Sequence, residues 1–479
     1  MQKKFITNLA LVLILNLLIK PFWILGVDRG VQNAVGSAEY GFYYALLNFS
    51  FLFNILLDLG ITSFNNRNIS QNNQLLNKHL SSIIVLRLLL ACFYLCITLL
   101  AGYLIGYSPR QLEILTILGF NQVLISFILY LRSNLAGLHL FKTDSFISVM
   151  DRIIMIALCG FLLWGNATNG VFKIIWFVWA QTISYVLTGL ITLFIVIDKA
   201  RLKKLSISKA FFLMILKKSY PFAILVLLMT FYNRIDSVML ERMLPEGSSS
   251  TGIYASAYRL LDSVSMIAFL FAGLLLPIFS RMIKQKLSVE GLVRLSYCLL
   301  VIPAITLAIS CSFFHTPLMA LLYQSHVSES GSILSILMFS LVPVSTTYIF
   351  GTLLTANGNL RMLNIVAFCG MVLNIVLNLI LIPRYQIVGA AASSLITQTL
   401  TCIAQIFVAR NVFSLHINYK LILKSILYVL ICYGIFHFIL QTSLDWRAQW
   451  MIGLGVCLIT AFFLRLINPR YLFDILQTE

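Results

Sequence analysis

The chain has 479 residues, of which 60% are hydrophobic and only 10% are charged. Soluble domains carry about a quarter of their residues as charges, so this composition excludes a soluble globular protein. Long continuous apolar runs also exclude a β-barrel, whose strands alternate in polarity. The net charge of +18 is not gathered in a soluble basic domain, which argues against nucleic-acid binding.

Apolar stretches long enough to cross about 30 Å of hydrocarbon predict an all-α integral membrane protein with about 14 transmembrane helices. The first stretch follows Lys3 and Lys4 and continues to Gly26 without a small-residue cleavage site, so we interpret it as a retained span rather than a signal peptide. In chain order, the predicted spans are 6–27, 40–62, 80–106, 112–137, 145–165, 171–197, 219–241, 252–279, 291–312, 330–356, 360–382, 386–410, 420–440 and 447–467.

Lysine and arginine residues in the loops predict the orientation. Most of them lie on the side of the two termini, and the opposite loops carry only Arg29, Arg110, Lys173, Arg242, Arg384 and Arg447. Cytoplasmic loops are the ones enriched in these residues. We therefore expect both termini in the cytoplasm.

A basic connection between spans and a short internal repeat, here called the echo, predict that the chain consists of two halves. The segment DKARLKKLSISKAFFLMILKKS follows the sixth predicted span, and GSAEYGFY (36–43) shares its glycine, serine and tyrosine spacing with GSSSTGIY (247–254). Six spans separate the two copies, which predicts a parallel repeat about an axis along the membrane normal. The predicted domains are an N-terminal lobe (1–198), a cytoplasmic linker (199–218), a C-terminal lobe (219–412), and two further helices with a cytoplasmic tail (413–479).

Ionisable residues inside the spans are the candidates for function. Each costs about 2.5–3.5 kcal/mol at mid-span, so it faces a partner or a cavity. Arg259 and Asp262 are three residues apart and share a helix face, whereas Arg234 and Asp236 point to nearly opposite sides. We interpret the following as substrate-binding cavity residues, with structural ion pairing as the alternative: Lys20, Asp58, Arg234, Asp236, Arg259 and Asp262.

Other ions in the spans have simpler explanations. Arg87, Arg132 and Arg152 lie near predicted cytoplasmic ends, where snorkelling to lipid headgroups explains them. Asp58 could also cap or pair locally. Lys20 is followed by Pro21, which predicts a kink in the first span.

Signatures of catalysis do not occur in the sequence. The six histidines show no metal-ligand spacing, and there is neither a phosphate-binding glycine loop nor a nucleophile elbow. The sequence therefore predicts a protein that is not an enzyme, with no catalytic residue and no metal site.

Three stretches carry a family resemblance. AVGSAEYGFYYALLNFSFLFNILLDLGITSFNNRNIS resembles the opening of polysaccharide flippases, and RIDSVMLERMLPEGSSSTGIYASAYRLLDSV resembles their seventh and eighth spans. ANGNLRMLNIVAFCGMVLNIVLNLILIPRYQIVGAAASSLITQ resembles spans eleven and twelve. The chain is thus similar to the O-antigen and exopolysaccharide flippases of the multidrug/oligosaccharidyl-lipid/polysaccharide exporter superfamily. The Asn-rich NNRNISQNNQ, which includes Arg67, departs from the family pattern, and we interpret it as a polar cytoplasmic loop.

The resemblance implies two six-helix lobes around a central cavity, two further C-terminal helices, and alternating access in the bacterial cytoplasmic membrane. It implies a polyprenyl-diphosphate-linked oligosaccharide as substrate, the lipid bilayer and other polysaccharide assembly proteins as partners, and no cofactor. Coupling to H⁺ or Na⁺ is left open. Cations inside the bundle fit this substrate, because a diphosphate is an anion that arginine and lysine bind strongly in a low dielectric.

Two other functions compete with this one. A cation-coupled multidrug exporter of the same superfamily would favour acidic residues in the lobes, whereas the deep ions of this chain are at least as basic as acidic. A membrane-embedded polysaccharide polymerase would need a sizeable loop outside the membrane or an acidic catalytic motif.

Overall fold

The computed structural model describes residues 15–16, 18–62, 65, 69, 75–138, 140–165, 172–199, 209–416 and 418–466. In these ranges the regular structure is helical, without strands. Eleven of the described helices are long and apolar enough to cross a membrane. The chain is therefore a multi-pass, all-α membrane protein, which confirms the predicted fold class. The first residues of span one, Arg67, residues 200–208 of the predicted linker and the C-terminal tail lie outside the described residues.

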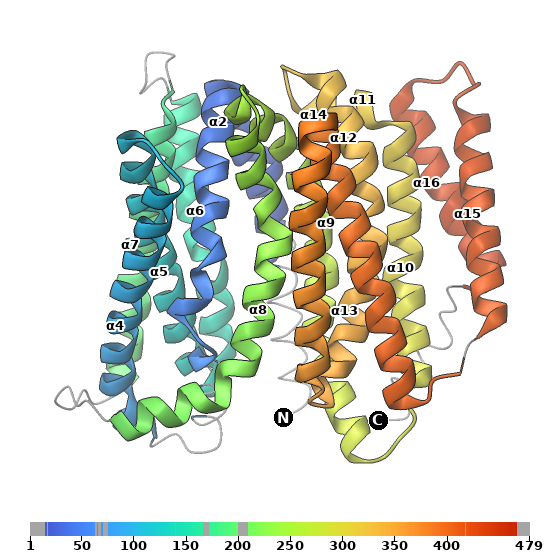
Figure 1. Cartoon of the computed structure of the whole chain (residues 1–479). Coiled ribbons are helices and arrows are strands. Elements are labelled where there is room, and N and C mark those ends of the chain that lie inside the picture. The colour runs from blue at the N-terminus through green and yellow to red at the C-terminus, as the bar shows by residue number, and fades with distance from the viewer. Residues whose placement is uncertain are drawn as a thin grey trace. The chain divides into compact units, whose positions relative to one another are not determined.

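Two of these helices have a break in the backbone, and the breaks explain how the helices correspond to the predicted spans. Helix α14 (Leu360–Phe413) is interrupted at Gln386, where φ is 51°, and Figure 1 shows its two arms side by side. Helix α2 (Arg29–Leu52) is interrupted at Gly36, where φ is 83°. Glycine tolerates this left-handed backbone without strain. Because α14 therefore holds two predicted spans and the first span is described only in part, the count of 14 stays a prediction.

The chain divides into two compact units, residues 1–252 and 253–479. Helices α4 to α7 run side by side in the first unit (Figure 1). The elements of unit 1 are η1 (Trp23–Asp28), α2, η2 (Asn54–Leu57), α4 (Leu75–Leu104), α5 (Pro109–Gly137), α6 (Phe141–Trp164), α7 (Ile174–Lys199), α8 (Lys209–Met243) and the start of α9 (Gly247–Lys284).

Local sequence explains where two elements of unit 1 begin. Pro21 removes a backbone donor from the first span, and a π-helical turn, η1, follows it directly. Helix α5 begins with Pro109 after Ser108, whose hydroxyl accepts from the backbone N–H of Gln111 while the Gln111 side chain accepts from the N–H of Ser108. This reciprocal capping box fixes both the start of α5 and the orientation of the Gln111 amide.

Tyrosines and polar residues form much of the interior of unit 1. The rings of Tyr40 and Tyr44 stack at 6.2 Å between centroids, and Tyr94 donates to the carbonyl of Ser50 at 2.8 Å. Leucine and phenylalanine side chains instead cover the outside, as on Leu88, Phe161 and Phe194. An apolar exterior around a polar interior is expected where lipid replaces water, because lipid offers no hydrophobic drive for helix packing.

Unit 2 has an aliphatic and aromatic core. Phe279, Ile302, Phe314 and Phe436 are completely or almost completely buried in it. Helices α15 and α16 lie side by side at one edge (Figure 1). Besides α9 and α14, the elements are α10 (Glu290–Phe313), α11 (His315–Leu322), α12 (Val327–Phe339), α13 (Leu341–Ala356), α15 (Tyr419–Ile439) and α16 (Trp446–Phe463).

The units differ from the predicted lobes in the position of α8. The sequence repeat assigns this helix to the C-terminal lobe, but it packs against α2 and so falls within unit 1. A helix that belongs to one half of a sequence repeat can still pack against the other half in a given conformation. The division into two six-helix lobes therefore stays a prediction.

Candidate functional site

The two echo segments of the sequence meet in unit 1. A Cβ atom added to Gly41 would overlap the carbonyl oxygen of Ser248, and one added to Gly252 would overlap the carbonyl oxygen of Ser37. Gly41 and Gly252 occupy equivalent positions of the echo, so the contact is reciprocal. We call these four residues the glycine crossing. Only glycine permits backbones to approach this closely.

Hydrogen bonds surround the glycine crossing. The Gln32 side chain donates to the carbonyl of Gly252 at 2.8 Å, and the hydroxyls of Ser37 and Ser249 are 3.5 Å apart. The predicted orientation places this end of unit 1 on the extracytoplasmic side. In this conformation α8 and the start of α9 are therefore held against α2 at the predicted outer end.

A cluster of charges surrounds Lys20 in unit 1. Arg132 pairs with Asp144 at 2.7 Å, and Arg152 lies 3.8 Å from the carboxylate of Asp151. The charges of Arg152, Asp151 and Arg132 all act on the half-buried ammonium of Lys20. Among the described residues of this cluster, three cations thus face two carboxylates, which leaves one positive charge in excess.

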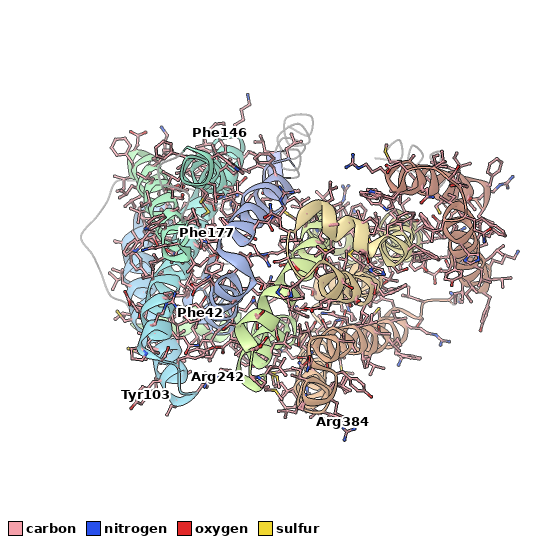
Figure 2. The ribbon with its side chains drawn as sticks, turned by 90° about the horizontal axis from the view of Figure 1, so that it is seen from above. Phe42, Tyr103, Phe146, Phe177, Arg242 and Arg384 are labelled. Atoms are coloured by element: carbon pink, nitrogen blue, oxygen red, sulfur yellow. The ribbon has the colours of Figure 1, made fainter. Side chains whose placement is uncertain are left out.

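Aromatic rings hold Arg152 in this cluster. Its guanidinium carbon lies 5.7 Å from the ring centroid of Trp23 and 5.9 Å from that of Tyr185, and it donates to the Tyr185 hydroxyl at 3.1 Å. Trp23 in turn stacks on Phe177, which Figure 2 shows inside the helix bundle, with a centroid separation of 5.8 Å. Cation–π contacts of this kind stabilise a desolvated cation.

The snorkelling interpretation of Arg87 is wrong, and the other two arginines have partners within unit 1. Arg87 is buried, Arg132 is paired with Asp144, and Arg152 is held by Trp23 and Tyr185. Proximity to a predicted cytoplasmic end gave no information on side-chain direction, which helix packing decides.

Arg234 and Asp236 lie on α8 in different environments. The guanidinium of Arg234 is half-buried, 3.5 Å from the Asn48 side-chain oxygen and 5.6 Å from the Phe51 ring centroid. Asp236 is 1% exposed. The contacts of Arg234 with Asn48 and Phe51 show that it faces α2, and the opposite direction expected for Asp236 stays a prediction.

Asp58 belongs to a network of hydrogen bonds with Arg87 and Thr62. Its carboxylate accepts from Arg87, from the Thr62 hydroxyl and from the backbone N–H of Thr62 at 3.1 Å. Arg87 also donates to the carbonyl and hydroxyl of Ser126 at 2.9 and 2.8 Å. The side chain of Arg87 is only 4% exposed, against 29% for Asp58. Local pairing, the alternative for Asp58, is therefore observed, and its cavity role stays a prediction.

We expect Arg87→Gln to lower the amount of folded protein, because it leaves Asp58 without its cation. Breaking a buried ion pair by removing one partner costs about 3–5 kcal/mol. Membrane abundance and the thermal unfolding midpoint should both fall. The double change Asp58→Asn with Arg87→Gln should recover most of the loss; if it is as unstable as the single change, the pairing is not what matters.

Arg259 and Asp262 belong to unit 2. Both are half-buried on α9, three residues apart, and the Ser263 hydroxyl donates to the carbonyl of Arg259 at 2.7 Å. The helical spacing keeps them on one face, as predicted. Their pairing with each other stays a prediction.

Sequence reasoning missed two features of unit 1. Asp28, placed just beyond the first span, is buried and accepts from the Tyr40 hydroxyl at 2.8 Å. Glu241, near the end of α8, accepts from the side-chain amide of Gln111 at 2.8 Å. Both acids lie at predicted span ends, where an interfacial charge is ordinary, so the sequence offers no strong signal for either.

Comparison with known families identifies the family to which the chain belongs. The family described as polysaccharide biosynthesis protein matches residues 30–283, which is more than half of the chain. The chain belongs to this family. It is accordingly a membrane protein of polysaccharide biosynthesis, which confirms the resemblance seen in the sequence.

Solved structures of low sequence identity share the fold. The inward closed conformation of the lipid II flippase MurJ has a TM-score of 0.74 at 18% identity, covering 95% of this chain and 99% of that chain. An outward-facing multidrug resistance MATE transporter of the MOP superfamily has a TM-score of 0.61 at 16% identity, covering 86% and 96%. The polysaccharide biosynthesis protein described here thus has the fold of this superfamily of transporters and flippases.

Two curated relatives match a part of the chain. An uncharacterized membrane protein of Methanocaldococcus jannaschii is 29% identical over 38% of this chain and 42% of its own length. The capsular polysaccharide biosynthesis protein CapF of Staphylococcus aureus is 25% identical over 37% and 45%. The matches therefore span less than half the length of either relative.

Proposed function

We propose that this protein moves polyprenyl-diphosphate-linked oligosaccharide repeat units across the bacterial cytoplasmic membrane for the assembly of O-antigen, capsule or exopolysaccharide. The observation that carries the proposal is the excess positive charge around Lys20. An unneutralised cation inside a membrane-spanning bundle is costly and marks a functional site. An anionic diphosphate would balance it through charge-assisted hydrogen bonds.

Alternating access follows from the predicted two-lobe architecture. The glycine crossing closes the predicted outer end of unit 1, so substrate would enter from the cytoplasmic side in this conformation. The crossing would then separate to release the glycan outside. The lipid tail stays in the bilayer throughout, and only the diphosphate and the sugars pass along the polar interior.

Deletion of the gene tests the substrate class directly. Cells without the protein should accumulate the lipid-linked repeat unit on the cytoplasmic leaflet and lack surface polysaccharide. Purified protein in vesicles should move a fluorescent polyprenyl-diphosphate oligosaccharide between leaflets. Normal surface polysaccharide in the deletion strain, together with no leaflet transfer by the purified protein, would reject the proposal.

The alternative is cation-coupled multidrug export, and the shared fold with MATE transporters favours it. The two functions differ in the charge of the substrate. A multidrug exporter would lower cellular accumulation of organic cations and would not need the excess positive charge around Lys20. Drug susceptibility of the deletion strain therefore separates them.

Arg259 and Asp262 allow a test of structural against substrate-binding roles in unit 2. If they only pair with each other, Arg259→Gln should lower protein abundance, and adding Asp262→Asn should restore both abundance and export. If Arg259 binds diphosphate, as we propose, the double variant should regain abundance and stay inactive. Complementation of a flippase-deficient strain, read beside membrane abundance, gives the answer. Full activity of the double variant would remove Arg259 from the site.

A further inference from the structure

Glu241 has an unusual set of contacts near the end of α8. One carboxylate oxygen accepts from the side-chain amide of Gln111 at 2.8 Å. The other oxygen is buried and has no hydrogen-bond partner among the described residues. The orientation of the Gln111 amide is fixed, because its oxygen accepts from the N–H of Ser108 at 2.8 Å. A single neutral donor thus serves the whole carboxylate.

The neighbouring cation, Arg242, acts on the carboxylate of Glu241 only through its charge. Arg242 donates instead to the backbone carbonyl of Ile105 at 2.5 Å, and its guanidinium carbon lies 5.2 Å from the Tyr107 ring centroid. Among the described residues it makes no ion pair with Glu241. Tyr103 lies in the last turn of α4. Seen from above, Arg242 lies at the same edge of unit 1 as Tyr103 (Figure 2). Arg242 therefore ties α8 to the turn between α4 and α5.

Tyr107, in that turn, is the other polar group close to Glu241. It is 5% exposed, and its hydroxyl has no hydrogen-bond partner in the described part of the chain. Burial raises the pKa of Tyr107, and the negative charge of Glu241 raises it further. The phenol therefore stays protonated. The cation at the start of α5, Arg110, pairs with Glu39 of α2 at 2.9 Å.

These contacts favour the neutral carboxylic acid. Burial of an ionised carboxylate is costly unless it is paired or fully hydrogen-bonded. Glu241 has neither arrangement while α8 contacts the α4–α5 turn. Once α8 moved away from this turn, water would solvate the carboxylate and the ionised form would become favourable.

We propose that Glu241 is a proton-binding site at the outer end of unit 1. It takes up a proton from the outer solution when α8 contacts the α4–α5 turn and releases the proton when this contact opens. The idea deepens the proposed function, because the same motion would separate the glycine crossing. By linkage, a group that holds its proton more tightly in the closed form stabilises that form at low pH and opposes it as the pH rises.

Distance measurements between spin labels test the proposal without any substrate. Cysteines at Tyr103 and Pro245, both exposed, place labels on the two sides of the contact in a chain whose native cysteines have been replaced. The protein is oriented in vesicles with the inner pH fixed, and the outer pH is raised from about 5 to about 9. We expect the fraction of short distances to fall severalfold over this range.

Two variants give the decisive comparison. Glu241→Gln is permanently neutral and should keep the short distance at every pH. Glu246→Gln, at an exposed acid five residues further along the chain, should respond as the unaltered protein does. A Glu241→Gln protein that still responds to pH, or an unaltered protein that does not, would overturn the proposal; a response to the inner pH would overturn its sidedness. A pH response in a protein that fails the lipid-transfer assay would reject the proposed function and leave the proton site standing.

Discussion

Gly41→Ala should abolish polysaccharide export while leaving a folded protein in the membrane. The added methyl group would overlap the carbonyl oxygen of Ser248, a backbone atom that cannot turn aside as a side chain could. Overpacking costs about 1–3 kcal/mol, which shifts a two-state equilibrium by about 5- to 150-fold. The conformation closed at the glycine crossing should therefore be depopulated. Complementation of a flippase-deficient strain measures export, and disulfide formation between Ser37→Cys and Ser249→Cys measures closure.

The chain offers a reciprocal variant and a matched control. Gly252→Ala should have the same effect as Gly41→Ala, because its methyl group would overlap the carbonyl oxygen of Ser37. Gly273→Ala, within α9, should be neutral or slightly stabilising, since nothing lies within 4 Å of its added Cβ. If Gly41→Ala and Gly252→Ala both export normally, the glycine crossing is not part of the transport cycle.

Lys20→Gln should lower export by about 10- to 100-fold, because a hydrogen bond to a charged group contributes about 1.5–3 kcal/mol. The loss should appear in transport and not in abundance, since the neutral side chain also relieves repulsion from Arg132 and Arg152. Lys20→Arg should retain part of the activity if only charge matters. Arg234→Gln should show the same pattern. Transfer of the lipid-linked oligosaccharide in vesicles is the direct measurement.

Lys173→Gln is the matched control for Lys20→Gln. Lys173 is exposed at the start of α7 and should tolerate the change with normal export. A variant of Lys20 that loses abundance as well as transport would indicate a structural ion network around Arg152 and Asp151. Normal transport by both Lys20→Gln and Arg234→Gln would contradict the proposed diphosphate site.

Residue patterns were sufficient for those properties that short segments determine by themselves. A membrane span follows from the length and polarity of its own residues, and the kink predicted at Pro21 follows from local backbone chemistry. The family resemblance likewise rested on short motifs, and the match over residues 30–283 confirmed it. The echo of Gly41 and Gly252 was also visible in the sequence.

Tertiary structure alone decided which residues the echo and the intramembrane ions contact. Asp58 and Arg87 lie on separate elements, and Arg152 is held by rings from η1 and α7. The contact of Gln111 with Glu241 joins residues 130 positions apart. The physical reason is that an ion in an apolar medium must find its partner wherever helix rotation and packing bring one. Sequence therefore determined which residues are costly to bury, and packing determined how each of these costs is offset.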